Sequence, residues 1–185
     1  MMRIAISSSA SQVDVDQSYL DKSREVISYL ADQGCTLNWG SGKFCIMGIC
    51  YEEFSKRGNK IYGYTTKKYL FELPDLPNAE HVVLEDTFDL KKHLFNDSDV
   101  IICLPGGIGG LSEPLSYIEE IRSNNDEKKM IIYNINGWFD DFQNGLKHLQ
   151  NENFIEDDVF SCYKLVNTFE EFKEEFEKIK ADKVC

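Results

Sequence analysis

Short apolar segments alternate with amphipathic ones along almost the whole chain, and this alternation limits the possible folds more than any other feature. The apolar segments have the length of strands, and the segments between them carry apolar residues at helical spacing. Such an order predicts βαβ units with right-handed crossovers, and so a parallel sheet with helices on both faces. We expect one α/β domain over residues 1–185, with three layers and a mainly parallel sheet of about seven strands. The strands are expected at residues 3–7, 35–42, 59–65, 81–85, 99–105, 128–135 and 163–167.

Local signals mark where the helices begin and where the chain turns. Helices are expected at residues 18–34, 45–58, 87–98, 111–123 and 137–154, and after Thr168. Thr87 is the predicted N-cap of the third helix, because its hydroxyl can accept a hydrogen bond from the first turn. Thr168 and Glu171 have the spacing of a capping box. Two prolines predict a loop over residues 67–80.

The composition argues against several classes of function. A formal charge of −12 disfavours a nucleic acid or an anionic membrane as partner, because both bind to basic surfaces. No apolar run is long enough to span a membrane, and the one in MMRIAISSSA is too short for a signal peptide, so we expect a cytoplasmic protein. The six cysteines form no CxxC pair and have no histidine cluster nearby, which predicts reduced thiols and no metal site. No lysine stands in a recognisable pyridoxal-phosphate context, and no cofactor is expected.

Three loops that follow strands stand out as candidate binding elements: SSSAS (7–11), GSGKFCIMG (40–48) and PGGIGGLSE (105–113). In a parallel sheet, ligands bind beyond the carboxyl ends of the strands. Glycine there permits positive φ and lets a ligand reach the backbone, and a helix N-terminus favours an anion. The two glycine loops could therefore hold a phosphate and its sugar, or the glycines could simply shape turns. Neither loop has the G-x-G-x-x-G dinucleotide fingerprint in its expected context or the G-K-[ST] of a P-loop.

The motif PGGIGGLSE resembles the P-G-G-x-G-T-x-x-E signature of the "lonely guy" (LOG) family, the cytokinin-activating phosphoribohydrolases long labelled lysine decarboxylases. NWGSGKFCIMG resembles the second glycine-rich motif of that family, and NINGWFDDFQNGLKHLQNENFI resembles a third segment. The resemblance runs in order over about residues 3–170. It implies a Rossmann-like fold, a homodimer, and hydrolysis of the N-glycosidic bond of a nucleoside 5′-monophosphate to free base and ribose 5-phosphate.

The resemblance also implies roles for individual residues. Glu113 would be catalytic, stabilising the oxocarbenium-like charge that develops on the ribose. Glycine amides would bind the 5′-phosphate, and residues of the two other loops would contact the ligand, with Met47 as the floor of the site. The phosphate-binding and sugar-lining residues would be Gly106, Gly107, Gly109, Gly110, Ser8, Gly40, Ser41 and Gly42.

The sequence departs from the family pattern at one catalytic position. The family's arginine falls on Leu90, and the lysine that follows it is kept as Lys91, which we take as the second catalytic candidate, with Lys43 as another. The loss of the arginine leaves open a non-catalytic nucleotide-binding or sensing module as the alternative function. Gly110 replaces the threonine of the motif, and Pro114 predicts a helix that begins near Gly110, because proline is tolerated in a first turn.

Further side chains could serve the site or only the fold. Phe44, Phe88 and Tyr117 are candidates for contacts to the base, although each also suits a core position. His81 and His148 are predicted to lie on the surface, and His93 is a weak acid–base candidate.

Overall fold

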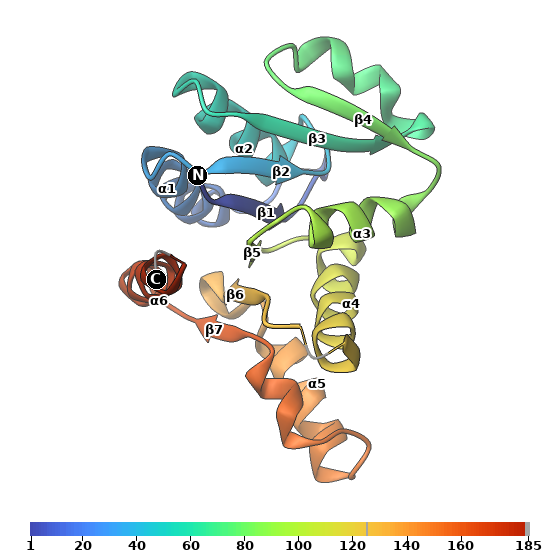
Figure 1. Cartoon of the computed structure of the whole chain (residues 1–185), viewed down its shortest axis with the longest axis vertical. Coiled ribbons are helices and arrows are strands. Elements are labelled where there is room, and N and C mark those ends of the chain that lie inside the picture. The colour runs from blue at the N-terminus through green and yellow to red at the C-terminus, as the bar shows by residue number, and fades with distance from the viewer. Residues whose placement is uncertain (125, 184–185) are drawn as a thin grey trace.

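A seven-stranded parallel sheet runs through the computed structural model, which describes residues 1–124 and 126–183 (Figure 1). The strand order is β4-β3-β2-β1-β5-β6-β7, and every pair of neighbours is parallel. The α/β fold class and the parallel sheet predicted from the alternation are therefore confirmed. The strands are β1 (Arg3–Ser7), β2 (Thr36–Trp39), β3 (Ile61–Thr66), β4 (Glu80–Leu84), β5 (Val100–Cys103), β6 (Lys129–Tyr133) and β7 (Lys164–Val166).

Helices cover both faces of this sheet, and α5 with the segment after it projects at one end of the molecule (Figure 1). Three short 3₁₀ segments, η1 (Lys67–Asp75), η2 (Ile135–Gly137) and η3 (Asp157–Ser161), lie in connections. The α-helices are α1 (Gln17–Asp32), α2 (Cys45–Lys56), α3 (Thr87–Asn96), α4 (Ile108–Asn124), α5 (Asp140–Asn151) and α6 (Phe169–Asp182). None of the helices in residues 1–124 and 126–183 is both long enough and apolar enough to cross a bilayer.

Two hydrophobic cores lie on opposite faces of the sheet, because successive side chains of a strand point to opposite faces. In β1, Ile4 and Ile6 pack into the core under α1, α2 and α6, whereas Ala5 packs into the core under α3, α4 and α5. Ile101 and Ile102 of β5 divide in the same way. Strands buried on both faces read as continuous apolar runs, which is the pattern that made β5 recognisable.

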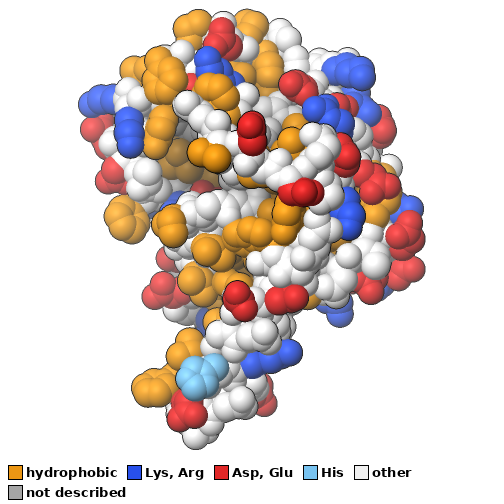
Figure 2. Space-filling view, turned by 180° about the vertical axis from the view of Figure 1, so that it is seen from behind, with side chains coloured by type: hydrophobic (Ala, Val, Ile, Leu, Met, Phe, Trp, Pro, Cys, Tyr) orange, Lys and Arg blue, Asp and Glu red, His pale blue; other side chains and the backbone are white. Residues whose placement is uncertain are grey.

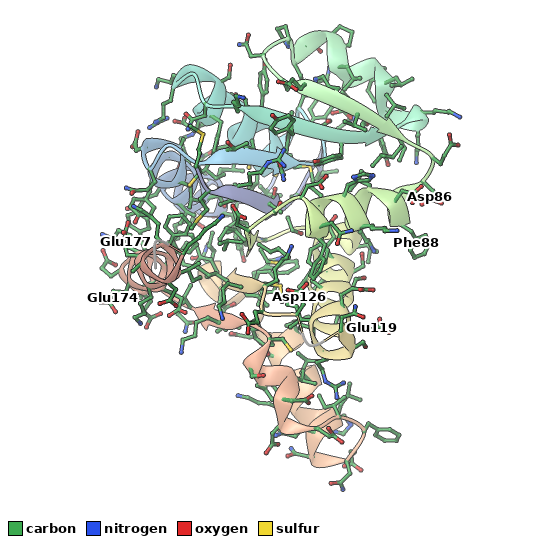
Figure 3. The ribbon with its side chains drawn as sticks, in the orientation of Figure 1. Asp86, Phe88, Glu119, Asp126, Glu174 and Glu177 are labelled. Carbon is green, nitrogen blue, oxygen red and sulfur yellow. The ribbon has the colours of Figure 1, made fainter. Side chains whose placement is uncertain are left out.

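Several local boundaries differ from the expectations. Asp86, not Thr87, is the N-cap of α3, and its carboxylate accepts from the amides of Phe88 and Asp89 (Figure 3). A carboxylate and a hydroxyl both cap well, and the carboxylate also favours the positive end of the helix dipole. Thr168 and Glu171 do form the predicted capping box.

Two proline predictions were wrong. Residues 67–80 do not form a plain loop, because η1 spans Lys67–Asp75 and contains Pro74. The helix α4 begins at Ile108, which places Pro114 inside the helix rather than in its first turn. The pyrrolidine ring there removes one intrahelical hydrogen bond to the carbonyl group four residues earlier, at Gly110.

The described cysteines (Cys35, Cys45, Cys50, Cys103 and Cys162) are all free thiols, and Cys103 is fully buried in β5 as predicted. Cys185 lies outside the described residues.

Candidate active site

The candidate site lies where the strand order reverses, between β1 and β5. These two strands are neighbours in the centre of the sheet, yet β1 connects onward to β2 on one side and β5 to β6 on the other. Their connections leave in opposite directions, and this opens a crevice beyond the carboxyl ends of the strands. The loops that follow β1 and β5 are SSSAS and PGGIGG, two of the loops that the sequence singled out.

Gly106 allows these two loops to touch. A Cβ on this residue would lie 3.1 Å from both the Cα atom of Gly110 and the carbonyl carbon of Ser8, and 3.2 Å from the amide nitrogen of Ser9. All three are backbone atoms, which cannot move aside as the end of a side chain can. Ser9 also donates its amide to the carbonyl oxygen of Pro105 at 3.1 Å, which joins the loops directly.

The glycines of PGGIGG do not have the positive φ angles that the sequence suggested. Among the described glycines, positive φ occurs at Gly34, Gly58 and Gly137, none of which belongs to this loop. Around Gly107, Gly109 and Gly110, a Cβ would meet nothing within 4 Å. Their contribution is therefore open space above the backbone rather than an unusual conformation.

The N-terminus of α4 presents free amide groups to this open space. The first intrahelical bond of the helix runs from the Leu111 amide to the carbonyl oxygen of Gly107, at 3.0 Å. The amides of Ile108, Gly109 and Gly110 precede that bond and donate to no other group in the described part of the chain. Unpaired amides together with the helix dipole make this end attractive to an anion such as phosphate.

A cavity of about 440 Å³ begins at this helix end, and we call it the Glu113 cavity. Glu113 lies in the second turn of α4 and is only 7% exposed, yet it is one of the residues that line the cavity. Of the other expected residues, Gly109, Gly40, Ser41, Gly42, Met47 and Lys91 also line it. Gly106 and Gly107 line a neighbouring cavity, whereas Ser8 and Gly110 are buried beside the two.

Burial raises the pKa of the Glu113 carboxyl above its ordinary value, because the charged form loses its hydration. The Ser7 hydroxyl and the Lys91 ammonium act in the opposite direction and favour the charged form. The hydroxyl of Tyr117 is buried without a hydrogen-bond partner. Burial and the nearby Glu113 together raise the pKa of Tyr117. Glu113 is thus a carboxylate in an environment of low polarity, which suits interaction with a positive charge.

Lys91 and Leu90 both line the Glu113 cavity, from the side formed by α3. The Lys91 ammonium donates to the Ser112 hydroxyl at 2.9 Å, next to Glu113 in the chain. Lys43 does not line the cavity, because its ammonium pairs with Asp75. His93 is also outside it, stacked on Tyr64 and paired with Asp97. Of the candidate bases and cations, the structure therefore brings only Lys91 to Glu113.

The loop before α2 is shaped by close contacts with Met47. A Cβ on Gly42 would lie 2.7 Å from the Met47 sulfur, so this glycine lets the methionine close one wall. Ser41 adopts a positive φ of 53°, which is unusual for a residue with a side chain. Its hydroxyl is 3.1 Å from Nδ1 of His81, whose Nε2 is 3.0 Å from the carbonyl oxygen of Leu76. The prediction of a surface position for His81 was therefore wrong, whereas His148 is exposed as predicted.

Glu72 is a second carboxylate of the Glu113 cavity, and the sequence did not indicate it. It lies in η1, is 5% exposed, and accepts a hydrogen bond from the Lys43 amide at 2.9 Å. Two aromatic side chains of η1, Tyr69 and Phe71, line the same cavity. Of the rings considered for contacts to the base, Tyr117 is buried in the core and Phe88 is 78% exposed.

Comparisons with known proteins agree with the motifs. A family described as "Possible lysine decarboxylase" matches residues 47–176. The chain is 26% identical over 168 residues to the cytokinin riboside 5′-monophosphate phosphoribohydrolase LOG of Oryza sativa subsp. japonica, covering 86% of this chain and 69% of that protein. It is 28% identical over 138 residues to the cytokinin riboside 5′-monophosphate phosphoribohydrolase of Mycobacterium tuberculosis, covering 74% and 73%.

Solved structures of low sequence identity share the fold. The molybdenum cofactor carrier protein of Chlamydomonas reinhardtii superposes with a TM-score of 0.67 at 11% identity, covering 97% of this chain and 98% of that one. The molybdenum cofactor binding protein of Rippkaea orientalis gives the same TM-score at 16% identity, with 96% of each chain covered. At such identities the likeness concerns the arrangement of strands and helices, not the ligand.

Proposed function

The chain belongs to the family described as possible lysine decarboxylases, which includes the LOG phosphoribohydrolases, and from this premise we propose that it hydrolyses a nucleoside 5′-monophosphate. The products are the free base and ribose 5-phosphate. Water adds to C1′ of the ribose as the C1′–N bond breaks, and the base leaves with a proton. The similarity to named phosphoribohydrolases supports this class of hydrolase, and the particular base is part of the proposal.

The observation that carries the proposal is a buried carboxylate beside a helix N-terminus with free amides. We propose that the 5′-phosphate binds to the amides of α4, which leads the attached ribose toward Glu113 in the same cavity. Bond cleavage develops positive charge on the ribose ring, and a carboxylate in a weakly solvated cavity stabilises that charge better than the neutral substrate. Gly40, Ser41 and Gly42 would contact the sugar, with Met47 beneath it.

Lys91 is the proposed second catalytic residue. Its ammonium is held at the cavity wall by the Ser112 hydroxyl, and it favours the charged form of Glu113. We propose that it keeps Glu113 ionised and that it offers a positive charge to the phosphate or to the departing base. No step of this scheme needs a cofactor or a metal ion.

The alternative is a module that binds nucleotides without cleaving them. The observation in its favour is Leu90, which lines the cavity at the position of the family's arginine and can neither donate a hydrogen bond nor carry charge. In that case the amides of α4 and the walls of the cavity would serve binding alone.

We also propose that the protein acts as a homodimer in the cytoplasm. Exposed apolar side chains surround the mouth of the Glu113 cavity, and such a patch suits contact with a second copy. The Phe88 side chain extends outward from α3 (Figure 3). Seen from behind the view of Figure 1, hydrophobic side chains form a band across the molecule with acidic and basic ones around it (Figure 2). The exposed apolar residues that line the cavity are Tyr69, Phe71 and Ile108, and Phe88 is exposed on α3, the helix that also carries Leu90 and Lys91.

The test is release of free base from a panel of nucleotides. The protein is incubated with AMP, GMP, CMP, UMP and isopentenyl-AMP, and the products are separated by chromatography. Glu113→Gln is measured beside Glu119→Gln, which changes an exposed glutamate of the same helix. Release that is lost in the first variant and kept in the second supports hydrolysis. Tight binding without release by the unaltered protein supports the alternative.

A further inference from the structure

We propose that a second cavity, on the far side of the PGGIGG loop, binds an uncharged aromatic group joined to the nucleotide through its phosphate. The preferred ligand would then be a dinucleotide, two nucleosides linked through their 5′-phosphates, rather than a simple monophosphate. This inference rests on the proposed function in one respect, because it takes the phosphate to lie at the N-terminus of α4.

The second cavity has about 460 Å³, close to the 440 Å³ of the Glu113 cavity. Both volumes fall within the range of about 300–1,000 Å³ that is usual for small-molecule sites. We call it the Trp138 cavity. Its walls are largely apolar and include Val15, Tyr19, Ile46 and Trp138. An apolar cavity with two aromatic side chains offers a planar base both stacking and removal from water.

The Trp138 ring is held in place by the segment that follows β6. It packs edge-on against Phe139, with ring centroids 4.5 Å apart, and Phe139 is fully buried. The Phe139 amide donates to the Asn134 side chain at 2.7 Å. Gly137 takes a φ of 75° in the same turn. The tryptophan therefore presents a half-buried ring on a rigid support, so little side-chain entropy is lost on binding.

The two cavities lie on either side of the same segments of the chain, because neighbouring residues of these segments line one cavity or the other. The loop after β1 places Ser9 and Ser11 in the Trp138 cavity and Ala10 and Gln12 in the Glu113 cavity. At the start of α4, Gly106 and Gly107 line the Trp138 cavity, whereas Ile108 and Gly109 line the Glu113 cavity. Gly107 is exposed, and a Cβ there would meet nothing within 4 Å, so the loop carries no side chain at the point where the lining passes from one cavity to the other. A ligand with its phosphate at this loop can therefore extend into both cavities.

Charge favours a neutral group over a further free phosphate. Asp16 is the charged side chain among the described residues that line the Trp138 cavity. Hydrogen bonds from Ser18 lower the pKa of its carboxyl, so it is ionised at neutral pH. A carboxylate repels a terminal phosphate but accepts hydrogen bonds from the hydroxyls of a ribose. A second nucleoside satisfies both the apolar walls and this acid.

The test compares AMP, ADP and diadenosine diphosphate by isothermal titration calorimetry. Diadenosine diphosphate is expected to bind at least tenfold more tightly than AMP, whereas ADP, which adds only phosphate, is not. Binding should also quench tryptophan fluorescence, because Trp138 is accessible and Trp39, the other tryptophan, is fully buried. In Trp138→Leu the ratio of the AMP and diadenosine diphosphate dissociation constants should fall to near one. Phe154→Leu, at an exposed ring outside both cavities, should leave the ratio unchanged.

The outcomes separate this inference from the proposed function. Equal affinities for AMP and diadenosine diphosphate would overturn the second subsite, even if AMP is hydrolysed. A tenfold gain that depends on Trp138, with no base released from any nucleotide, would support the subsite and overturn the hydrolase. A gain that survives in Trp138→Leu would overturn the assignment to this cavity. Absence of binding by all three ligands would overturn both proposals.

Discussion

Replacement of Glu113 by glutamine should make the protein more stable and, at the same time, inactive. The carboxyl is buried and its pKa is raised, so its charged form is poorly solvated in the folded state and lowers stability once the pH exceeds the raised pKa. Glutamine has nearly the same shape and no charge, and the Ser7 hydroxyl beside the carboxyl can donate to its amide oxygen instead. Active sites often keep such destabilising groups because function needs them.

The size of the effect follows from the burial of the group. A buried polar group without adequate partners destabilises by about 1–3 kcal/mol, and a charged one by more. If the substitution recovers about 2 kcal/mol, the melting temperature of a chain of this length should rise by about 4–8 °C. Ser7 and Lys91 already compensate part of the charge, which limits the gain.

The pH dependence gives the sharper test. A raised pKa means that the folded state binds the proton more tightly than the unfolded state, so stability falls as pH rises from the ordinary value of 4.5 through the raised value. The advantage of the variant should therefore be full above that window and absent at about pH 4, where the carboxyl is protonated in both states. Thermal unfolding followed by circular dichroism from pH 4 to pH 8 measures this, with Glu119→Gln as the exposed control. A stability difference that does not change with pH would refute the reasoning.

Three further substitutions test other parts of the site. Gly106→Ala should weaken nucleotide binding and lower stability by about 1–3 kcal/mol, because the new methyl group meets three backbone atoms at 3.1–3.2 Å, whereas Gly145→Ala, in α5 with open space at its Cβ, should do neither. Calorimetry and thermal unfolding of the two variants would contradict this if they behaved alike. Lys91→Met should lower the rate of base release by about 100-fold, the size found for a lost electrostatic contact to a transition state, whereas Lys43→Met should be nearly silent because Lys43 pairs outside the cavity. Steady-state kinetics decide, and equal losses in both variants would remove Lys91 from the mechanism. Phe88→Glu should convert a dimer to a monomer in light scattering after size exclusion, and a monomeric unaltered protein would refute the proposed interface.

The sheet could be predicted from the sequence because its signal is repeated in every unit. Each strand is a short apolar run and each helix has a polar face, so an error of two residues at one boundary does not alter the alternation. The loop after β5 could be identified for a similar reason, since four glycines in five positions exceed what a turn requires. Glu113 follows this loop in the sequence. It lines the cavity because it lies on the buried face of α4, which starts at Ile108.

Features that depend on contacts between distant segments could not be predicted. Glu72 reaches the cavity because η1 folds back and its carboxylate accepts from the Lys43 amide, a pairing across 29 residues. His81 of β4 is half-buried, and its Nδ1 lies 3.1 Å from the hydroxyl of Ser41, which belongs to the loop before α2. The glycines of PGGIGG were expected to have positive φ angles. Instead, Gly107, Gly109 and Gly110 leave open space beside the backbone, and that space depends on which segments pack around the loop. None of these causes leaves a local pattern in the sequence.

If Leu90 stands at the position of the family's arginine, as the resemblance implies, the chemistry of the cavity changes while Lys91 keeps a positive charge there. An arginine has a planar group with five donors and can hold two oxygen atoms at once, whereas an ammonium is a single point of charge on a flexible stem. Lys91 compensates for this flexibility with its hydrogen bond to Ser112, a residue of the same helix as Glu113. The cation and the carboxylate are therefore both positioned by α4, whose N-terminus also offers the amides for the phosphate. A shift of α4 would move the amides and Glu113 together and would break the hydrogen bond that holds Lys91 of α3, so substrate orientation and charge stabilisation should be lost or kept as a unit.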